Sequence, residues 1–319
     1  MTAPANPTVN PAARAMLRDV LAGLSATPRA IPSKYLYDAE GSRLFDRITA
    51  LDAYYPTRTE LGILREHIDE IAECIGPGAV LIEYGSGSST KTRLLLDALA
   101  PTLAAYVPID ISREHLLRTA ERLRADYPGL RIEPVVADYT RPHTIPDDPV
   151  QRRKRVVFFP GSTVGNFEPE EAQRFLGQIV EVIGPGGGLL LGVDRKKDPA
   201  VLERAYDDDE GVTAAFNLNL LARLNRDLGA DFDLDAWAHR AFYDAERGRI
   251  EMHLVSLRDQ TVHVGGRAFA FREGETIHTE NSYKYGPGEI EAIAAPAGLH
   301  VVREWSDPAG WFSLLYFEV

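Results

Sequence analysis

From residue 79 to residue 194, short apolar runs alternate with stretches whose apolar residues have helical spacing. The apolar runs are AVLIEYG, AAYVPIDI, RIEPVVADY, RVVFFPGST and GLLLGVD. The segments TKTRLLLDAL, REHLLRTAERLRADYP and EPEEAQRFLGQIVEVIG lie among them and read as amphipathic helices. This order is typical of a parallel sheet with helices on both faces. We therefore expect a doubly wound α/β core.

The pattern changes outside this region. DPAVLERAYDD and GVTAAFNLNLLARLNRDLG have helical spacing, whereas RIEMHLVSLR and TVHVGGRAFAFR alternate like antiparallel strands, the latter with a Gly-Gly turn. We predict that residues 197–286 form an α+β domain inserted into a core made of residues 61–196 and 287–319. Residues 1–60 are expected to form a helical segment that contributes to the inserted domain. Between Ser42 and Gly76 we expect two helices that are broken near Pro56, since proline interrupts a helix interior.

Charge and composition exclude several classes of protein. The net charge is −12, and an even field of that sign repels the phosphate backbone, so we expect no nucleic acid partner. The single cysteine, Cys74, excludes an internal disulfide and a cysteine-rich metal site. No segment approaches about 18 consecutive apolar residues, and MTAPANPTVNPAARAM does not read as a signal peptide. We expect a cytoplasmic monomer without a membrane span.

The histidines are scattered along the chain. No two of them have the spacing of metal ligands on one helix, so we expect no metal. They are His67, His115, His143, His239, His253, His263, His278 and His300.

A glycine-rich segment, EYGSGSSTKT, follows the first core strand and completes neither of two nucleotide motifs. Thr90 stands where a phosphate-binding loop and a dinucleotide fingerprint each require a glycine. Gly85 and Gly87 nevertheless allow a tight turn and a close approach of the backbone to a ligand. The loop suits a nucleoside without phosphates better than it suits ATP or NAD.

Acidic residues lie at or just before the ends of the first three predicted strands: Glu83, Asp110 and Asp138. Ligands bind at the carboxyl ends of the strands in open α/β sheets. Asp110 can accept hydrogen bonds from both hydroxyls of a ribose, and Asp138 can accept one from an exocyclic amine such as that of adenine. The alternative is that the glycines form a plain strand-to-helix turn and that the aspartates cap helices. The pattern E-x-G-x-G with an acidic second strand resembles S-adenosylmethionine-dependent methyltransferases.

Further stretches make the resemblance more specific. KYLYDAEGSRLFDRIT, YYPTRTE, FFPGSTVGNF, AYDDDEGVTAAFNLN, ADFDLDAWAH and IEMHL are similar to segments of the histidine-specific S-adenosylmethionine methyltransferases of ergothioneine biosynthesis. The similarity covers nearly the whole chain. It implies a Rossmann-like methyltransferase core and trimethylation of the α-amine of L-histidine, which gives hercynine.

The resemblance also implies roles for individual residues. The cofactor contacts would be Gly85, Lys91, Asp110, Asp138 and Tyr139. The substrate contacts would be Tyr54, Asn166, Tyr206, Met252, Glu280 and Ser282, and Tyr37 would lie near the amine, so that Tyr37 and Asn166 are the catalytic candidates.

The imidazole end of histidine would be recognised by Glu280 and Ser282 of HTENSYKY. Residues i and i+2 of an extended segment face the same side, so a carboxylate and a hydroxyl can reach one ring. Asn281 and Tyr283 depart from the family pattern. Two other functions stay open: N-methylation of another amino acid or aromatic amine, and a cofactor-binding scaffold without activity.

Overall fold

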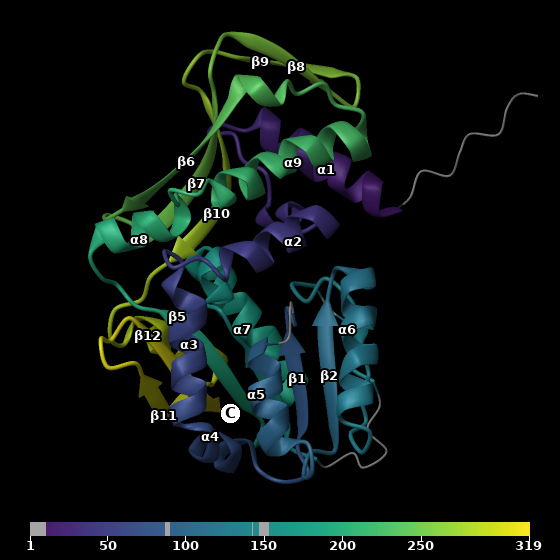
Figure 1. Ribbon diagram of the computed structural model, residues 1–319, viewed down its shortest axis with the longest axis vertical. Helices are drawn as coiled ribbons and strands as arrows, with labels where there is room; N and C mark the ends of the chain where they lie inside the picture. The colour runs from purple at the N-terminus through teal and green to yellow at the C-terminus, as the bar shows by residue number, and fades with distance from the viewer. Residues whose placement is uncertain (1–10, 87–89, 142, 147–152) are drawn as a thin grey trace, which may run out of the picture. The chain divides into compact units, whose positions relative to one another are not determined.

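A computed structural model describes residues 11–86, 90–141, 143–146 and 153–319. Gly87 of the predicted cofactor loop lies outside the described residues. The chain forms a seven-stranded sheet in the order β11-β12-β5-β4-β1-β2-β3 (Figure 1). The strands are β1 (Val80–Tyr84), β2 (Ala105–Asp110), β3 (Val135–Val136), β4 (Arg155–Phe159), β5 (Gly188–Asp194), β11 (His300–Ser306) and β12 (Phe312–Glu318).

One strand of this sheet runs against the others. Strands β5, β4, β1, β2 and β3 pair in parallel, whereas β12 pairs antiparallel with both β5 and β11. The strand order reverses next to β1, where ligands bind in doubly wound sheets. The predicted α/β core is confirmed.

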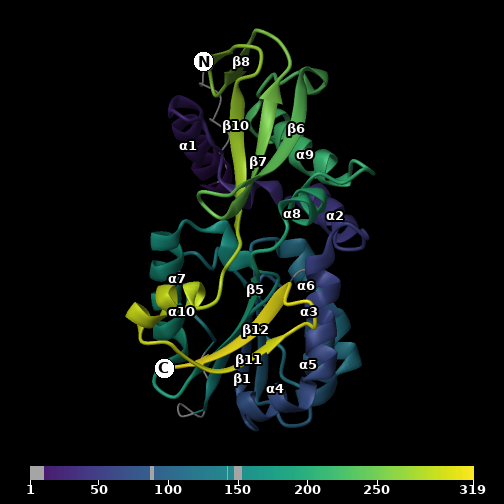
Figure 2. The same cartoon turned by 90° about the vertical axis from the view of Figure 1, so that its left-hand side faces the viewer.

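Helices cover both faces of the seven-stranded sheet. On one face, apolar residues of α3 (Tyr55–Glu66), α4 (Ile68–Ile75), α5 (Thr90–Leu99) and α6 (Arg113–Asp126) form one buried cluster with the strands. On the other face, α7 (Pro169–Ile183) and α10 (Glu289–Ala294) contribute to a second cluster. Figure 2 shows the sheet between α7 and α10 on one side and α3, α4 and α5 on the other. In sheets covered in this way, ligands bind at the carboxyl ends of the strands.

The remaining elements include two small sheets, β10-β7-β6 and β8-β9. The strands are β6 (Trp237–Asp244), β7 (Arg249–Ser256), β8 (Gln260–Val264), β9 (Arg267–Phe271) and β10 (Thr276–Tyr283). The other α-helices are α1 (Pro11–Ser25), α2 (Ala39–Ile48), α8 (Pro199–Tyr206) and α9 (Val212–Leu228). The short 3-10 helices are η1 (Ser33–Leu36), η2 (Thr163–Asn166), η3 (Leu234–Ala236) and η4 (Ala295–Ala297). The hairpin β8-β9 turns at Gly265 and Gly266, both with positive φ, as the Gly-Gly signal predicts.

The chain divides into two compact units. The first comprises the chain up to Phe45 with Tyr206–Phe242 and Glu251–Glu280, and the second comprises Asp46–Ala205, Tyr243–Ile250 and Asn281–Val319. These limits differ from the predicted ones at residues 46–60, where α3 packs on β12 and α5 of the sheet, and at residues 197–205, 243–250 and 281–286, which also belong to the second unit. The predicted substrate-binding role of the inserted region stays a prediction.

Two predictions of local structure are wrong in detail. The break near Pro56 is confirmed, since α2 ends at Ile48 and Pro56 occupies the first turn of α3, where its missing N–H costs nothing. The number of helices is wrong, because a second break at His67 gives three helices where two were expected. The third predicted strand is only two residues long, because Pro108 of the neighbouring strand β2 lacks the N–H that would extend the pairing of Tyr106 with residues 131–133.

The described helices include none that is long and apolar enough to cross a membrane.

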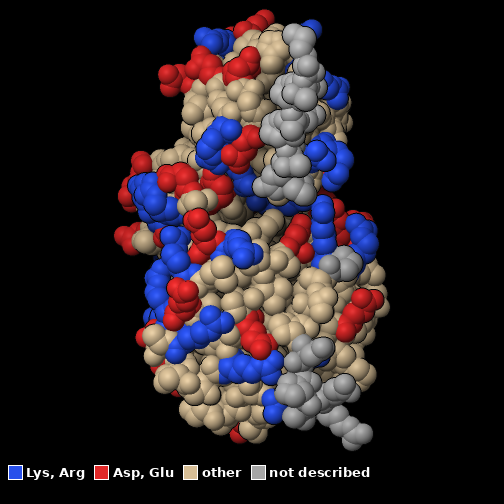
Figure 3. All heavy atoms as spheres, turned by 90° about the vertical axis from the view of Figure 1, so that its right-hand side faces the viewer, with Lys and Arg blue, Asp and Glu red and all other residues tan. Residues whose placement is uncertain are grey.

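Figure 3 shows acidic and basic side chains interspersed over one face of the molecule.

Candidate active site

The carboxyl ends of β1, β2 and β3 are joined by main-chain hydrogen bonds. The N–H of Gly85 donates to the carbonyl of Ile109 at 2.9 Å, and the N–H of Ala137 donates to the carbonyl of Asp110 at 3.2 Å. Gly85 has a φ of 74°, a conformation that favours glycine. The structure therefore brings together three of the predicted cofactor-binding segments, those of Gly85, Asp110 and Asp138.

An aromatic cluster supports Tyr139 at this edge. Its ring stacks on that of Tyr84, with centroids 5.3 Å apart and planes 5° apart, and meets the ring of Phe159 edge-on. A Cβ atom at Gly85 would lie 3.9 Å from the Tyr139 ring. The glycine loop and this aromatic ring are thus in direct proximity, as a site for a planar base requires.

Both aspartates are oriented by local turns and do not cap helices. An oxygen of Asp110 accepts the N–H of Ser112 at 2.8 Å, and Ser112 itself is the cap residue of α6. Asp138 accepts the N–H of Thr140 at 3.1 Å. These Asx turns fix the direction of each carboxylate. Two oriented carboxylates, an aromatic ring and a glycine turn fit a cationic adenosine derivative.

Glu83 differs from the two aspartates because it is buried inside the core. It accepts hydrogen bonds from the hydroxyls of Thr92, at 2.7 Å, and of Tyr106. Burial raises the pKa of Glu83 to about 7, against the opposing effect of these hydroxyls. The acidic residue of E-x-G-x-G therefore ties the loop helix α5 to strands β1 and β2.

The raised pKa of Glu83 predicts a pH dependence of stability. Between the unfolded pKa of 4.5 and the folded pKa of about 7, the folded chain binds more protons, so stability falls as pH rises through this window. We expect Glu83→Gln, which cannot ionise, to remove this loss, which is on the order of 3 kcal/mol. Urea unfolding at several pH values between 5 and 8 measures it. Parallel curves for the two proteins would show that the carboxyl ionises normally.

Lys91 lies in the first turn of α5, but its ammonium is directed to Glu60. The Nζ–Oε2 distance is 2.5 Å, and Glu60 is fully buried. The two oxygens of Glu60 also accept the N–H of Gly161 at 3.0 and 3.1 Å. Glu60 is the last residue of the motif YYPTRTE, and the sequence predicted no role for it. It connects α3, α5 and the segment that follows β4, whereas the contact of Lys91 with the cofactor stays a prediction.

The segment that carries Asn166 is held at two further points. Ser162 has a φ of 57°, unusual for a residue with a side chain, and its hydroxyl accepts the N–H of Asp194 at 2.9 Å. A Cβ atom at Gly165 would lie 2.8 Å from the carbonyl oxygen of Tyr283, so only glycine fits there. Asn166 is thus carried by a strained and tightly held segment, as catalytic positions often are.

A double-mutant cycle on Glu60 and Lys91 tests this connection. Lys91→Met leaves the buried Glu60 without its counter-charge and should destabilise the fold by roughly 2–4 kcal/mol, whereas Glu60→Gln leaves only the partly exposed Lys91 and should cost less. The double variant should lose much less than the sum, which urea unfolding without cofactor will show. Additive losses would mean that the ion pair does not hold the segment, and that Lys91 acts elsewhere.

On strand β10, Glu280 and Ser282 alternate with Asn281 and Tyr283, the two residues that depart from the family pattern. The side chains of Asn281 and Tyr283 donate hydrogen bonds to Glu168, at 3.0 and 2.6 Å, and Arg249 also donates to that carboxylate. Residues alternate across a strand, so Glu280 and Ser282 face the other side. The departures from the family pattern are therefore accounted for by contacts with the start of α7.

Ser282 adjoins a buried group of charges. Lys284 donates to the Ser282 hydroxyl at 2.7 Å and pairs with Asp194 at 2.8 Å. Asp194 also binds Lys197 and accepts the Tyr55 hydroxyl at 2.7 Å. Burial alone would raise the pKa of Asp194, but the ammonium groups of Lys284 and Lys197 outweigh it and keep the pKa below its ordinary value. The hydroxyl of Ser282 is consequently held by a lysine.

The remaining predicted residues belong to the first unit. The carbonyl of Tyr206 accepts a hydrogen bond from the Nε2 atom of His239 at 2.8 Å, and Nδ1 of that ring accepts the amide of Asn217 at 2.9 Å. Burial lowers the pKa of His239, which favours the neutral ring that this arrangement needs. Met252 is buried on β7, and its carbonyl accepts the hydroxyl of Thr279, the neighbour of Glu280.

The ring of Tyr37 packs between those of Phe45 and Phe216, with centroids 5.6 and 5.4 Å away.

The predicted site residues are divided between the two units. Gly85, Lys91, Asp110, Asp138, Tyr139, Tyr54, Asn166 and Ser282 belong to the second unit, and Tyr37, Tyr206, Met252 and Glu280 to the first. Helical and strand spacing could not reveal Glu60 or His239, whose partners are distant in the sequence.

Comparisons with known proteins agree on one family. A sequence model described as "Histidine-specific methyltransferase, SAM-dependent" matches residues 16–319. The chain is 45% identical to histidine N-alpha-methyltransferases of Mycolicibacterium smegmatis, over 95% of this chain and 94% of the relative, and of Mycobacterium tuberculosis, over 94% of each. A solved structure of a possible exported protein from Bordetella parapertussis shares the fold, with 14% identity, a TM-score of 0.50 and coverage of 95% of this chain and 87% of that chain.

Proposed function

Because the chain belongs to the histidine-specific, S-adenosylmethionine-dependent methyltransferases, we propose that it trimethylates the α-amine of L-histidine to give hercynine, the first step of ergothioneine biosynthesis. The observation that carries this proposal is the family match over almost the entire chain. The retained Glu280–Ser282 pair on β10 supports histidine as the amino acid. We further propose a cytoplasmic monomer.

The cofactor is S-adenosylmethionine, which supplies a methyl group on a positively charged sulfur. We assign the ribose hydroxyls to Asp110 and the adenine amine to Asp138, and the Tyr139 ring would lie against the base. Gly85 leaves room for the backbone to approach, and Lys91 remains a candidate contact. The negative charges of Asp110 and Asp138 suit a cationic ligand better than a phosphate.

The chain's task in the reaction is to position a neutral amine, take up protons and exclude water. Tyr54, Asn166 and Tyr206 would hold the carboxylate and amine of the substrate. Tyr37 would lie near the amine, where its hydroxyl can relay the proton released before each further methylation. Since Asn166 lies on the segment held by Glu60 and Ser162, its direction would persist through the three transfers.

At the other end of the substrate, Glu280 would accept the imidazole N–H and Ser282 would bind the second ring nitrogen. The ammonium of Lys284 already donates to the Ser282 oxygen. A hydroxyl that accepts from a lysine is best placed to give its own proton to an acceptor, so Ser282 would donate to the unprotonated ring nitrogen. Met252 would form a wall of this pocket.

Competition among amino acids tests the proposal. The protein is incubated with S-adenosylmethionine and an equimolar mixture of the protein amino acids, and the products are separated by mass spectrometry. Histidine should gain the mass of three methyl groups before any other amino acid reacts. A product from another amino acid would replace histidine as the substrate, and no product at all would favour a cofactor-binding scaffold.

A further inference from the structure

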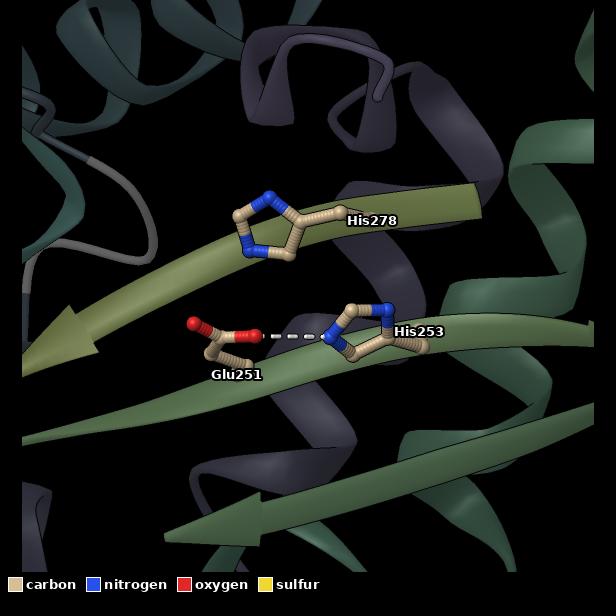
Figure 4. Close-up of side chains that lie close together, drawn as sticks. All are labelled: Glu251, His253 and His278. Carbon is tan, nitrogen blue, oxygen red and sulfur yellow. Dashed lines mark hydrogen bonds and ion pairs between the residues drawn. The ribbon is translucent and has the colours of Figure 1, made fainter. Parts of the chain in front are cut away.

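Two histidines and a glutamate lie close together on adjacent strands of the first unit. Glu251 and His253 belong to β7, and His278 belongs to β10 (Figure 4). One possible ligand atom of each residue lies within 4.8 Å of those of the other two. The Nε2 atom of His253 is 2.9 Å from an oxygen of Glu251, and the two imidazole rings have centroids 5.0 Å apart.

Strand geometry explains why the sequence did not reveal this cluster. Glu251 and His253 are two residues apart and therefore project from the same side of β7. His278 comes from the neighbouring strand, which is tied to β7 by the hydrogen bond from the Thr279 hydroxyl to the Met252 carbonyl. A search for helical ligand spacing misses both relationships. The expectation of no metal considered only that spacing.

The three side chains form a ligand set that divalent transition ions prefer. Two imidazoles and one carboxylate suit Zn²⁺ and its neighbours Co²⁺ and Ni²⁺. Two ligands of a tetrahedral ion with bonds of about 2.1 Å are about 3.4 Å apart, so the 2.9 Å between His253 and Glu251 would widen by about 0.5 Å around an ion. The Nε2 atom of His278 lies 3.1 Å from the carbonyl oxygen of Glu280, so the third ligand is either its Nδ1 atom or an Nε2 atom that gives up this contact.

The surroundings favour a held site over a chance surface contact. The side chains of His253 and Glu251 are only 13% and 11% exposed. The His253 ring stacks on Phe242 with planes 17° apart, and the His253 carbonyl accepts the amide of Asn217 at 3.1 Å. Such support restricts the ring before an ion arrives, which reduces the entropy that binding costs.

From this geometry we propose that Glu251, His253 and His278 form a binding site for one divalent transition ion, of the zinc class, that links β7 to β10. Water would complete the coordination. Transfer of a methyl group to an amine needs no Lewis acid, so the ion takes no part in that reaction. The proposal does not depend on the proposed substrate.

Metal titration of the tag-free, chelator-treated chain tests the proposal. Zn²⁺ binding is followed by calorimetry, and Co²⁺ binding by its visible absorption, which reports nitrogen and oxygen ligation directly. We expect one ion per chain and a rise in melting temperature that grows with metal concentration. His278→Ala and Glu251→Gln should each weaken binding by more than about tenfold and remove the stabilisation.

His263→Ala is the matched control, because His263 pairs with Asp231 at 2.9 Å but both side chains are more than half exposed. This variant should bind metal as the wild type does. Glu251→Gln keeps the size of its side chain, and thermal melting without metal shows whether either variant still folds. Equal affinity in the wild type and Glu251→Gln would overturn the proposal, as would loss of binding only in His263→Ala or the absence of saturable binding.

Discussion

The Asp110→Ala variant should lose S-adenosylmethionine binding while it keeps its fold. Asp110 ends β2 beside the glycine turn, and we assign it two charge-assisted hydrogen bonds to the ribose. Their loss should cost on the order of 3–5 kcal/mol, or roughly two to four powers of ten in affinity. Calorimetry of cofactor binding measures the change, and circular dichroism checks the fold.

Two further variants separate this role from a structural one. Asp110→Asn keeps an oxygen that can accept the Ser112 N–H, and so preserves the turn, but it has lost the charge. It should also bind the cofactor poorly. Asp126→Ala removes an exposed aspartate of α6 that pairs with Arg93, and it should bind normally. Near-normal affinity in Asp110→Ala would rule out the ribose assignment.

The Glu280→Ala variant should lose histidine preferentially among amino acids. A buried hydrogen bond to a charged acceptor contributes roughly 1.5–3 kcal/mol, so kcat/KM for histidine should fall about 10- to 200-fold. Amino acids with a ring that lacks a donor at that place should lose much less or should gain. Adding Met252→Val should shift the preference further toward bulky rings. Both substrates are measured on each variant, since specificity is a ratio.

Glu273→Ala provides the control, because Glu273 is an exposed acidic residue near the start of β10. Its ratio of histidine to other substrates should match that of the wild type. A uniform loss for every amino acid in Glu280→Ala would mean that Glu280 supports the fold or the cofactor, and the histidine pocket would then lie elsewhere.

The sequence predicts the parallel core well because burial on both faces leaves a direct trace. Strands β1, β2, β4 and β5 are largely apolar runs. In the helices between them, apolar residues recur every three to four positions. The third strand was predicted too long, because Pro108 of the neighbouring strand β2 lacks the N–H that would extend the pairing. Strands β6 and β10 were not predicted. They carry polar residues on one face, and the turn residues at their ends are too few to mark them.

Contacts between distant residues are the second limit. The Lys91–Glu60 pair and the His239–Tyr206 hydrogen bond each join residues more than thirty positions apart. Periodicity reports which face of an element is buried, but it does not report which partner lies opposite. The alternation of β10, by contrast, was enough to place Glu280 and Ser282 on one face, and the contacts of Asn281 and Tyr283 with Glu168 agree with it.

The position of the added methyl groups tests the central claim most directly. Histidine is incubated with the protein and S-adenosylmethionine, and the product is fragmented in a mass spectrometer beside authentic hercynine and ring-methylated histidines. We predict a product that carries three methyl groups and loses trimethylamine on fragmentation, with an unmodified imidazole. Methyl groups retained on imidazole fragments, or a product that stays singly methylated with excess cofactor, would contradict methylation of the α-amine to the trimethylated state.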